Sequence, residues 1–288
     1  MAKQPRSRAF NRILVALDST RASQSALESA ALLAEAMQYE LVGLFVEDSD
    51  LMMLANLPFS REVRRTGVIR NLDPDILQKE VEAHAAAARY ALRDVALRRR
   101  LRWSFRSVRG DVGAEFSAAA AEVDIVCISG RSADRYRRVP MGSPARVALE
   151  RRAPVLVAGN LADRIDKPIG VIVDQADGPS ESIRLAGQIA AKAKTGLVVL
   201  EFLPLEADIA ALRAQIDKEL PNGVTARYVL VSREDPCGLL DGLHRNDYSL
   251  MLYGVRADTP TPAWLDYVVN AGECPLLLVP ESNTADRD

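Results

Sequence analysis

The chain has 288 residues, of which 48% are apolar and 26% charged, a balance typical of globular proteins rather than disordered ones. The formal net charge of −2 provides no overall field that would draw the protein to nucleic acid or to a membrane surface. The three cysteines are scattered, and His84 and His244 stand far apart, so we expect neither a disulfide framework nor a metal site. Since no apolar run reaches the roughly 18 residues that span a bilayer, we expect a soluble cytoplasmic protein.

The elements of the first copy of a repeated pattern follow in chain order. Ile13 to Leu17 is a short run of branched apolar residues, typical of a strand buried on both faces. A helix is expected over 22–37 from its apolar spacing, followed by a second strand over 41–46. Further strands are expected at 103–108, 125–128 and 155–158, and further helices at 74–95, 112–121 and 144–151.

One segment of the first copy breaks this alternation of strands and helices. Residues 47–71 contain a run of apolar residues and then a basic patch. The segment is too long for a plain connection within a compact unit, so we expect an insertion that acts as a lid or a packing element.

A second copy repeats the order. Residues 13–18 read Ile-Leu-Val-Ala-Leu-Asp and residues 169–174 read Ile-Gly-Val-Ile-Val-Asp, so the two aspartates are 174 − 18 = 156 positions apart. The same offset continues through the next helix and strand. Strands are expected at 171–173, 197–200, 226–231, 250–253 and 276–279, and helices at 182–193, 207–220, 238–244 and near 265–270. Such a period is a whole domain, since solenoid units have about 20–50 residues.

The pattern therefore predicts an α/β fold made of two doubly wound, five-stranded parallel-sheet domains in tandem. The first domain covers residues 1–160 and the second 168–288, and the segment between them is a linker. We expect two separate sheets that superpose on each other. In such sheets ligands bind at the carboxyl ends of the strands, where the strand order reverses.

Two segments lie at that position in the first domain. Asp18, Ser19 and Thr20 follow the first strand, and they are interpreted either as ligand contacts or as the cap of the following helix. After the fourth strand comes a loop from Gly130 to Ser143. It contains Arg131, Arg135, Arg137 and Arg138 and leads into Pro144 at a helix start.

This loop has the chemistry of a phosphate site. Ser143 is a typical N-cap and Gly142 permits close approach of the backbone to a ligand. Free N–H groups at a helix N-terminus bind anions, and arginine recognises phosphate oxygens in bidentate fashion. The alternative is a solvated loop that leads to an ordinary helix.

The chain resembles the universal stress protein family. The resemblance rests on the strand followed by Asp-Ser, on Val-Arg-Gly-Asp at 108–111, on Gly130, on Met-Gly-Ser at 141–143 and on Ala-Pro-Val-Leu-Val at 153–157. It covers nearly all of both halves, which implies a Rossmann-like tandem member. Proteins similar to it either bind ATP or bind no nucleotide.

The resemblance implies which residues would hold an adenine nucleotide. Asp18, Ser19 and Val46 would flank the adenosine, while Gly130, Arg131, Gly142 and Ser143 would hold the phosphates. The family's motif has a second glycine, and Ala133 stands in its place here. The gap from there to Gly142 is also one residue short.

The second copy departs further from the motif. Counting back from the proline before the last strand places Ala263 and Trp264 where the first copy has Gly142 and Ser143. A large ring there would fill the phosphate space, so we interpret the second domain as degenerate and structural.

Three functions remain open from the sequence. One is a non-enzymatic regulatory stress protein that binds ATP or another adenine nucleotide in its first domain, and another is a ligand-free interaction and dimerisation module. The third is a slow ATP hydrolase, although no catalytic residue set is recognised. A homodimer or another protein partner is expected. The basic run at 97–109 is interpreted as a helix end and a strand rather than a nucleic-acid surface.

Overall fold

The computed structural model describes residues 11–18, 20–57, 59–63, 67, 69–71, 73–129, 150–159, 165–174, 180–203, 208–231, 248–260, 262, 264–265, 268–269 and 274–281. The first half contains β1 (Arg12–Ala16), α1 (Arg21–Met37), β2 (Glu40–Asp48), α2 (Ser49–Ala55), β3 (Arg61–Val63), β4 (Ile69–Asn71), α3 (Pro74–Arg98), β5 (Trp103–Gly110), α4 (Val112–Ala120), β6 (Ile125–Ser129) and β7 (Val155–Ala158). The second half contains β8 (Ile169–Val173), α6 (Glu181–Ala193), β9 (Leu197–Glu201), α7 (Ile209–Glu219), β10 (Ala226–Leu230), β11 (Leu250–Val255) and β12 (Leu276–Pro280).

Each half has the predicted doubly wound α/β fold. Within a half all neighbouring strands are parallel, with the order β5-β2-β1-β6-β7 in the first and β10-β9-β8-β11-β12 in the second. The order of the five strands in the sheet is therefore the same in both halves, as the repeat predicts. The predicted helices at 144–151 and 238–244 lie wholly or largely outside the described residues, although residues 150 and 151 are helical.

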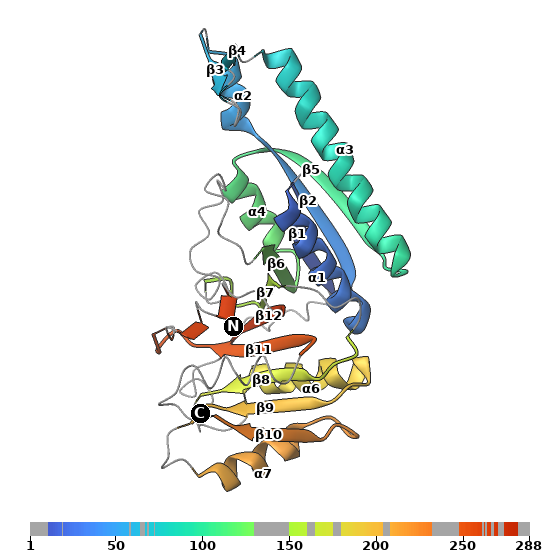
Figure 1. Cartoon of the computed structure of the whole chain (residues 1–288), viewed down its shortest axis with the longest axis vertical. Coiled ribbons are helices and arrows are strands. Elements are labelled where there is room, and N and C mark those ends of the chain that lie inside the picture. Colours follow the sequence, from blue (N-terminus) through green and yellow to red (C-terminus); the bar gives the residue numbers. More distant parts are fainter. Residues whose placement is uncertain are drawn as a thin grey trace, which may run out of the picture.

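The expectation of two separate sheets is wrong. The last strands of the halves, β7 and β12, pair antiparallel and join the halves into one ten-stranded sheet (Figure 1). Leu156 and Leu277 lie opposite each other in this pair and are fully buried. Pairing buries two apolar strands that would otherwise be exposed edges with unsatisfied backbone groups. Gly159 is needed beside the junction, since a Cβ there would lie 2.2 Å from the carbonyl carbon of Cys274.

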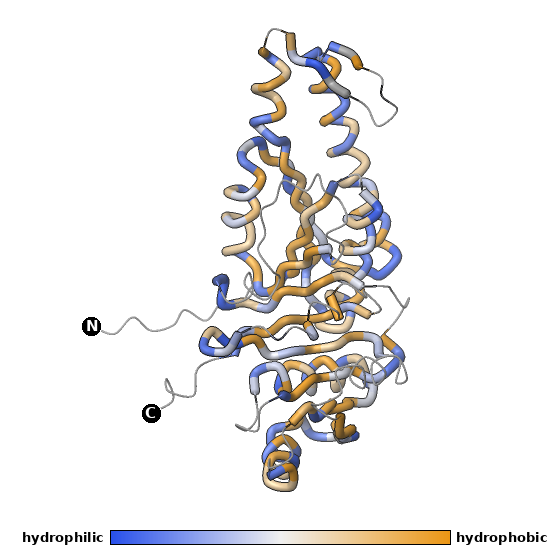
Figure 2. The backbone as a smooth tube through the Cα atoms, turned by 60° about the vertical axis from the view of Figure 1, so that its left-hand side comes forward, coloured by the Kyte–Doolittle hydropathy of each residue, from blue (hydrophilic) through white to orange (hydrophobic). Residues whose placement is uncertain are grey.

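Buried side chains form two clusters, one on each face of the large sheet, and the strands between them are coloured mostly hydrophobic in Figure 2. On one face of the sheet, α1, α3, α6 and α7 pack over a single cluster of buried side chains that runs through both halves. On the other face α4 packs on the first half, and Trp264 and Leu265 pack on the second. Because the first cluster is continuous, the halves share a core as well as a sheet.

Side chains at the helix starts explain where the helices begin. Thr20, Asp73 and Asp111 cap α1, α3 and α4 by accepting hydrogen bonds from backbone N–H groups of the first turn. Pro74 follows its cap at the first helical position, where its missing N–H costs nothing. None of the helices in the described part of the chain is long and apolar enough to span a bilayer.

The inserted segment forms an arm beyond the sheet (Figure 1). It contains α2 and the antiparallel pair β3–β4, beside the start of α3. Met53, Leu57, Phe59 and Ile69 in this arm are large apolar residues that are mostly exposed. The insertion is therefore a separate projecting unit, and whether it covers a ligand as a lid stays a prediction.

Candidate functional site

The candidate site lies at the carboxyl ends of β1 and β6, where the strand order of the first half reverses. β1 and β6 are hydrogen-bonded neighbours with Val15 opposite Cys127. The segments after both strands therefore begin side by side, as expected. Ser19, Gly130, Arg131, Gly142 and Ser143 lie outside the described residues, so their part in the site stays a prediction.

Asp18 is exposed at this edge and organises the turn into α1. Its Oδ1 accepts hydrogen bonds from the Thr20 backbone N–H at 2.8 Å and from the Thr20 hydroxyl at 2.6 Å. The Thr20 Oγ1 in turn accepts from the Ser23 N–H at 3.1 Å, and the Ser23 hydroxyl accepts from the Asp18 N–H at 2.9 Å. Thr20 is thus the helix cap, and one oxygen of Asp18 supports it. The carboxylate remains exposed beside this cap.

Val46 lies in the last part of β2, the neighbouring strand, opposite Val108 of β5. It is half-buried and packs against the core on the α4 face of the sheet. Strand alternation puts Leu14, Ala16 and Val46 on that same face. Val46 therefore contributes a small apolar side chain near the carboxyl edge, and its contact with an adenosine stays a prediction.

The second half fills the corresponding space with aromatic rings. The 156-residue offset relates Val46 to Phe202, since 46 + 156 = 202, and the strand registers relate Ile128 to Tyr253. The Trp264 ring meets the Tyr253 ring edge-on at 4.8 Å between centroids and the Phe202 ring at 6.2 Å. All three side chains are buried. Edge-to-face packing at these distances is favourable, so this cluster is a packed core.

Asp174, the aspartate of the second half, also has a hydrogen-bond partner within the chain. The Tyr253 hydroxyl donates a hydrogen bond of 2.8 Å to Oδ2 of Asp174. A small hollow remains beside this pair, lined by Asp174, Tyr253, Arg256, Thr259 and the prolines 260 and 262. Asp174, the residue that corresponds to Asp18, is thus hydrogen-bonded to a tyrosine of its own chain.

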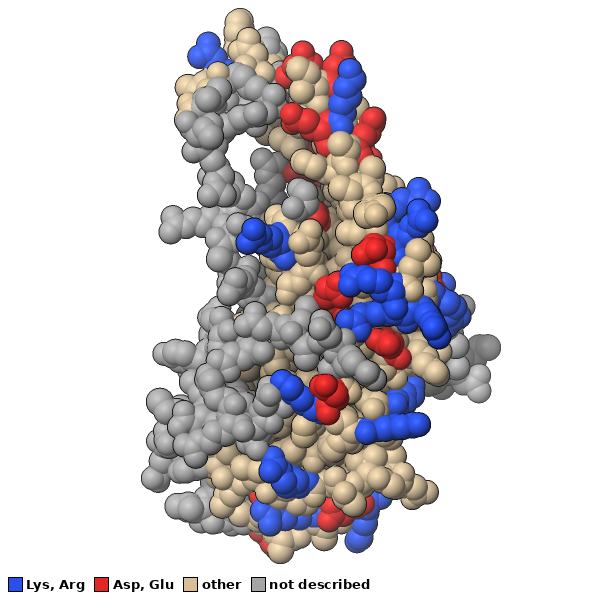
Figure 3. Space-filling model, turned by 45° about the vertical axis from the view of Figure 1, so that its right-hand side comes forward, with Lys and Arg blue, Asp and Glu red and all other residues tan. Residues whose placement is uncertain are grey.

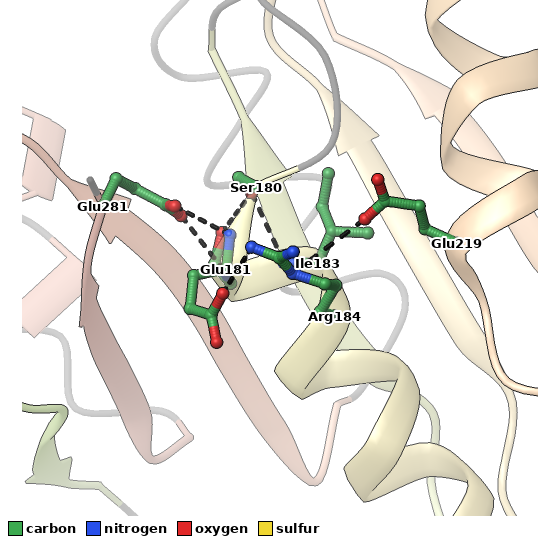
Figure 4. A network of polar contacts seen from close by, with 7 residues as sticks. Ser180, Glu181, Ile183, Arg184, Glu219 and Glu281 are labelled. Atoms are coloured by element: carbon green, nitrogen blue, oxygen red, sulfur yellow. Dashed lines mark hydrogen bonds and ion pairs between the residues drawn. The ribbon is translucent and has the colours of Figure 1, made fainter. Parts of the chain in front are cut away.

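A second carboxylate closes the start of α6 in the same half (Figure 4). The Glu281 carboxylate accepts hydrogen bonds from the backbone N–H groups of Glu181 at 2.7 Å and Ser182 at 3.0 Å. Gly254 permits this, since a Cβ there would lie 2.4 Å from Oε1 of Glu281. The N–H groups that attract anions at a helix N-terminus are therefore satisfied within the chain.

Sequence reasoning recognised Trp264 and missed its two neighbours. Phe202 could have been found, because the repeat offset alone makes it the equivalent of Val46. Tyr253 could not, because its equivalence to Ile128 depends on strand register. Among the described residues, no group of three or more His, Cys, Asp or Glu side chains could hold a metal ion.

Comparisons with known proteins agree with the architecture. No family model and no curated protein matches the sequence. The structure is similar to that of a universal stress protein from Archaeoglobus fulgidus DSM 4304, with a TM-score of 0.69, 15% identity and coverage of 94% of this chain and 99% of the other. It is also similar to a functionally unknown protein from Pseudomonas aeruginosa PAO1, with a TM-score of 0.55, 16% identity and coverage of 95% and 94%. Over nearly its whole length, the chain has the tandem α/β fold of a universal stress protein.

Proposed function

We propose that the protein is a non-enzymatic regulatory protein of the universal stress type, with one adenine-nucleotide site per chain in its first half. ATP is the nucleotide that the resemblance favours. The proposal places the site between Asp18 and Val46 on one side and the Gly130–Ser143 loop on the other, and it assigns no catalytic step to the chain.

The difference between the halves is the observation that carries this proposal. In the second half, Phe202, Tyr253 and Trp264 form a buried aromatic cluster and Tyr253 holds Asp174. The equivalent positions of the first half are Val46, Ile128 and Ser143, whose side chains are much smaller. At the described positions 46 and 128 the first half thus has no aromatic ring, and Asp18 is exposed beside the Thr20 cap.

Each proposed contact has a chemical basis. The exposed carboxylate of Asp18 can accept hydrogen bonds from an adenine amino group or a ribose hydroxyl. Val46 offers an apolar surface to the base. The arginines of the 130–143 loop and the N–H groups of a helix start at Ser143 would bind phosphate oxygens. Ala133, in place of the family's second glycine, would weaken the phosphate contacts.

Calorimetric titration of the full chain with ATP tests the proposal through one substitution. Val46→Phe copies the residue of the second half into the first, and we expect it to abolish measurable binding because the ring occupies the base position. Phe202→Val is the matched control at the equivalent position, and it should leave the stoichiometry and affinity unchanged. Circular dichroism and thermal unfolding check that both variants fold.

Binding that survives Val46→Phe, or that disappears with Phe202→Val, would contradict the assignment to the first half. A wild-type chain that binds no nucleotide would favour the alternative, a ligand-free interaction module.

A further inference from the structure

The outward face of α3 carries apolar side chains at intervals of seven residues. Ile76, Tyr90 and Leu97 are 45%, 69% and 59% exposed, and Ala83 between them is exposed as well. Positions 76, 83, 90 and 97 therefore lie along one side of the helix, which we call the α3 seam. Exposed apolar side chains on one side of a helix, with small alanines between them, offer a surface on which a second helix can pack.

The seam is distinct from the face of α3 that packs on its own domain. That inner face buries Leu77, Ala88, Leu92 and Val95 against α1 and the strands β2 and β5. At 100° per residue, the middle of the seam lies about 150° around the helix from these side chains. The domain core thus needs only one face of α3, and the apolar seam is surplus to the fold of a single chain.

The two ends of α3 carry opposite charge. Near its start lie Asp73, Asp75, Glu80 and Glu82, accompanied by Lys79. Towards its end lie Arg89, Arg93, Arg98 and Arg99, accompanied by Asp94. Figure 3 shows acidic side chains gathered at the far end of the molecule and basic ones further along the same side. Arg98 and Arg99 already pair with acidic side chains of their own chain, so the exposed Arg89 and Arg93 matter most.

We propose that the α3 seam binds the α3 seam of a second copy of this chain, with the two helices antiparallel. A two-fold axis between Ala86 and Ala87 would place Ile76 at the level of Leu97 of the second copy, since 76 + 97 equals 86 + 87. The same axis would place Ala83 at the level of Tyr90 of the second copy. Both alanines at the axis are exposed and small, which allows the helices to approach closely.

Charge selects the antiparallel orientation. Antiparallel pairing sets the acidic start of each α3 beside the basic end of the other, with Glu82 next to Arg93 across one flank. Parallel pairing would set acid beside acid and base beside base, and such contacts are destabilising. The complementarity is between two copies of one helix, so the occupant that fits best is this chain itself. The inference does not depend on nucleotide binding.

Sedimentation equilibrium of the full chain tests the assembly. We expect a dimer for the wild type and a dissociation constant raised at least about thirtyfold by Tyr90→Glu, as for a central interface residue. Leu230→Glu, at a residue on β10 that is 58% exposed, is the matched control and should leave the dimer intact. A wild-type chain that stays monomeric at its highest soluble concentration overturns the proposal, as does a dimer that dissociates with Leu230→Glu and not with Tyr90→Glu.

Cysteine cross-linking with a short bismaleimide tests the orientation, with the parent chain showing the background of its native cysteines. Ala86→Cys should cross-link to itself across the axis. Ile76→Cys should not, because the two copies of that residue would be about 30 Å apart at a rise of 1.5 Å per residue. A mixture of Ile76→Cys and Leu97→Cys chains should cross-link to each other. Self-cross-linking of Ile76→Cys chains would indicate parallel helices and overturn the proposal.

Discussion

Glu201 at the end of β9 is a fully buried carboxylate held by an arginine of α7. Arg213 donates from Nε to Oε1 at 2.8 Å and from Nη2 to Oε2 at 2.5 Å, and its guanidinium stacks 4.9 Å above the Tyr228 ring. The repeat offset places Phe45 at the equivalent position of the first half, since 201 − 156 = 45. The second half thus replaces an apolar contact with an ion pair between a strand and a helix.

Removing Arg213 alone should destabilise the protein more than removing Arg213 together with the negative charge of Glu201. We expect Arg213→Met to lower the free energy of unfolding by about 1.5–3 kcal/mol, because it removes two charge-assisted hydrogen bonds from a buried carboxylate while the exposed side of Arg213 lets water screen the loss. Adding Glu201→Gln to that variant should recover part of the loss. Urea unfolding measures both effects. A loss below about 1 kcal/mol for Arg213→Met would mean that the pair behaves like an exposed one.

Tyr248 makes the free energy of unfolding depend on pH in the alkaline range. Its side chain is buried, and this burial raises the pKa of the phenol to about 12 from 10.0. The unfolded chain therefore ionises first, so this contribution is intact below pH 10 and is lost as the pH rises from 10 towards 12. Within the described residues the hydroxyl has no hydrogen-bond partner, so Phe fits in its place.

Tyr248→Phe should therefore reduce the loss of stability between pH 8 and pH 11 by about 1 kcal/mol. The wild-type chain, unfolded under the same conditions at both pH values, is the reference for this comparison. The measurement is urea unfolding at the two pH values. Equal pH dependence in the wild type and Tyr248→Phe would contradict the assignment of this effect to Tyr248.

At the scale of elements, the sequence predicted the order and type of the long helices and buried strands well. Apolar runs such as 13–17 and 197–200 are typical of a strand buried on both faces, and caps such as Asp73-Pro74 mark helix starts. The antiparallel pair β3–β4 was missed because each strand has three residues, too short for a periodic pattern. The α3 seam was also missed, because a helix periodicity does not say which of its faces the domain covers.

The candidate site could be predicted only in part. Its place at the ends of β1 and β6 follows from the fold class, and the repeat identifies Asp18 and Asp174 as equivalents. Two features that close the second site depend on register and on long-range packing: the Tyr253–Asp174 hydrogen bond and the Glu281 contacts with α6. A strand-end residue such as Tyr253 can be compared with Ile128 only when the pairing of β8 with β11 is known.

At the scale of the whole molecule, one ten-stranded sheet joins the two halves, and the halves should remain together without a covalent link. They share the β7–β12 pair and a continuous core, to which α1 and α6 both contribute. We expect cleavage at a protease site inserted after residue 162 to leave a complex of both fragments in size-exclusion chromatography. A matched site placed in the linker of an unrelated two-domain protein whose domains share no sheet would serve as the control. Separation of the fragments under native conditions would contradict the shared core.

The difference between the two halves makes a direct prediction about ligand number. Native mass spectrometry of the freshly purified full chain, before and after addition of ATP, measures how many nucleotides each chain holds. We expect one per chain, since Asp18 of the first half is exposed while aromatic rings pack at the equivalent edge of the second. Two nucleotides per chain would show that the Phe202–Tyr253–Trp264 cluster does not close the second site, and none at saturating ATP would show that the first half is closed as well.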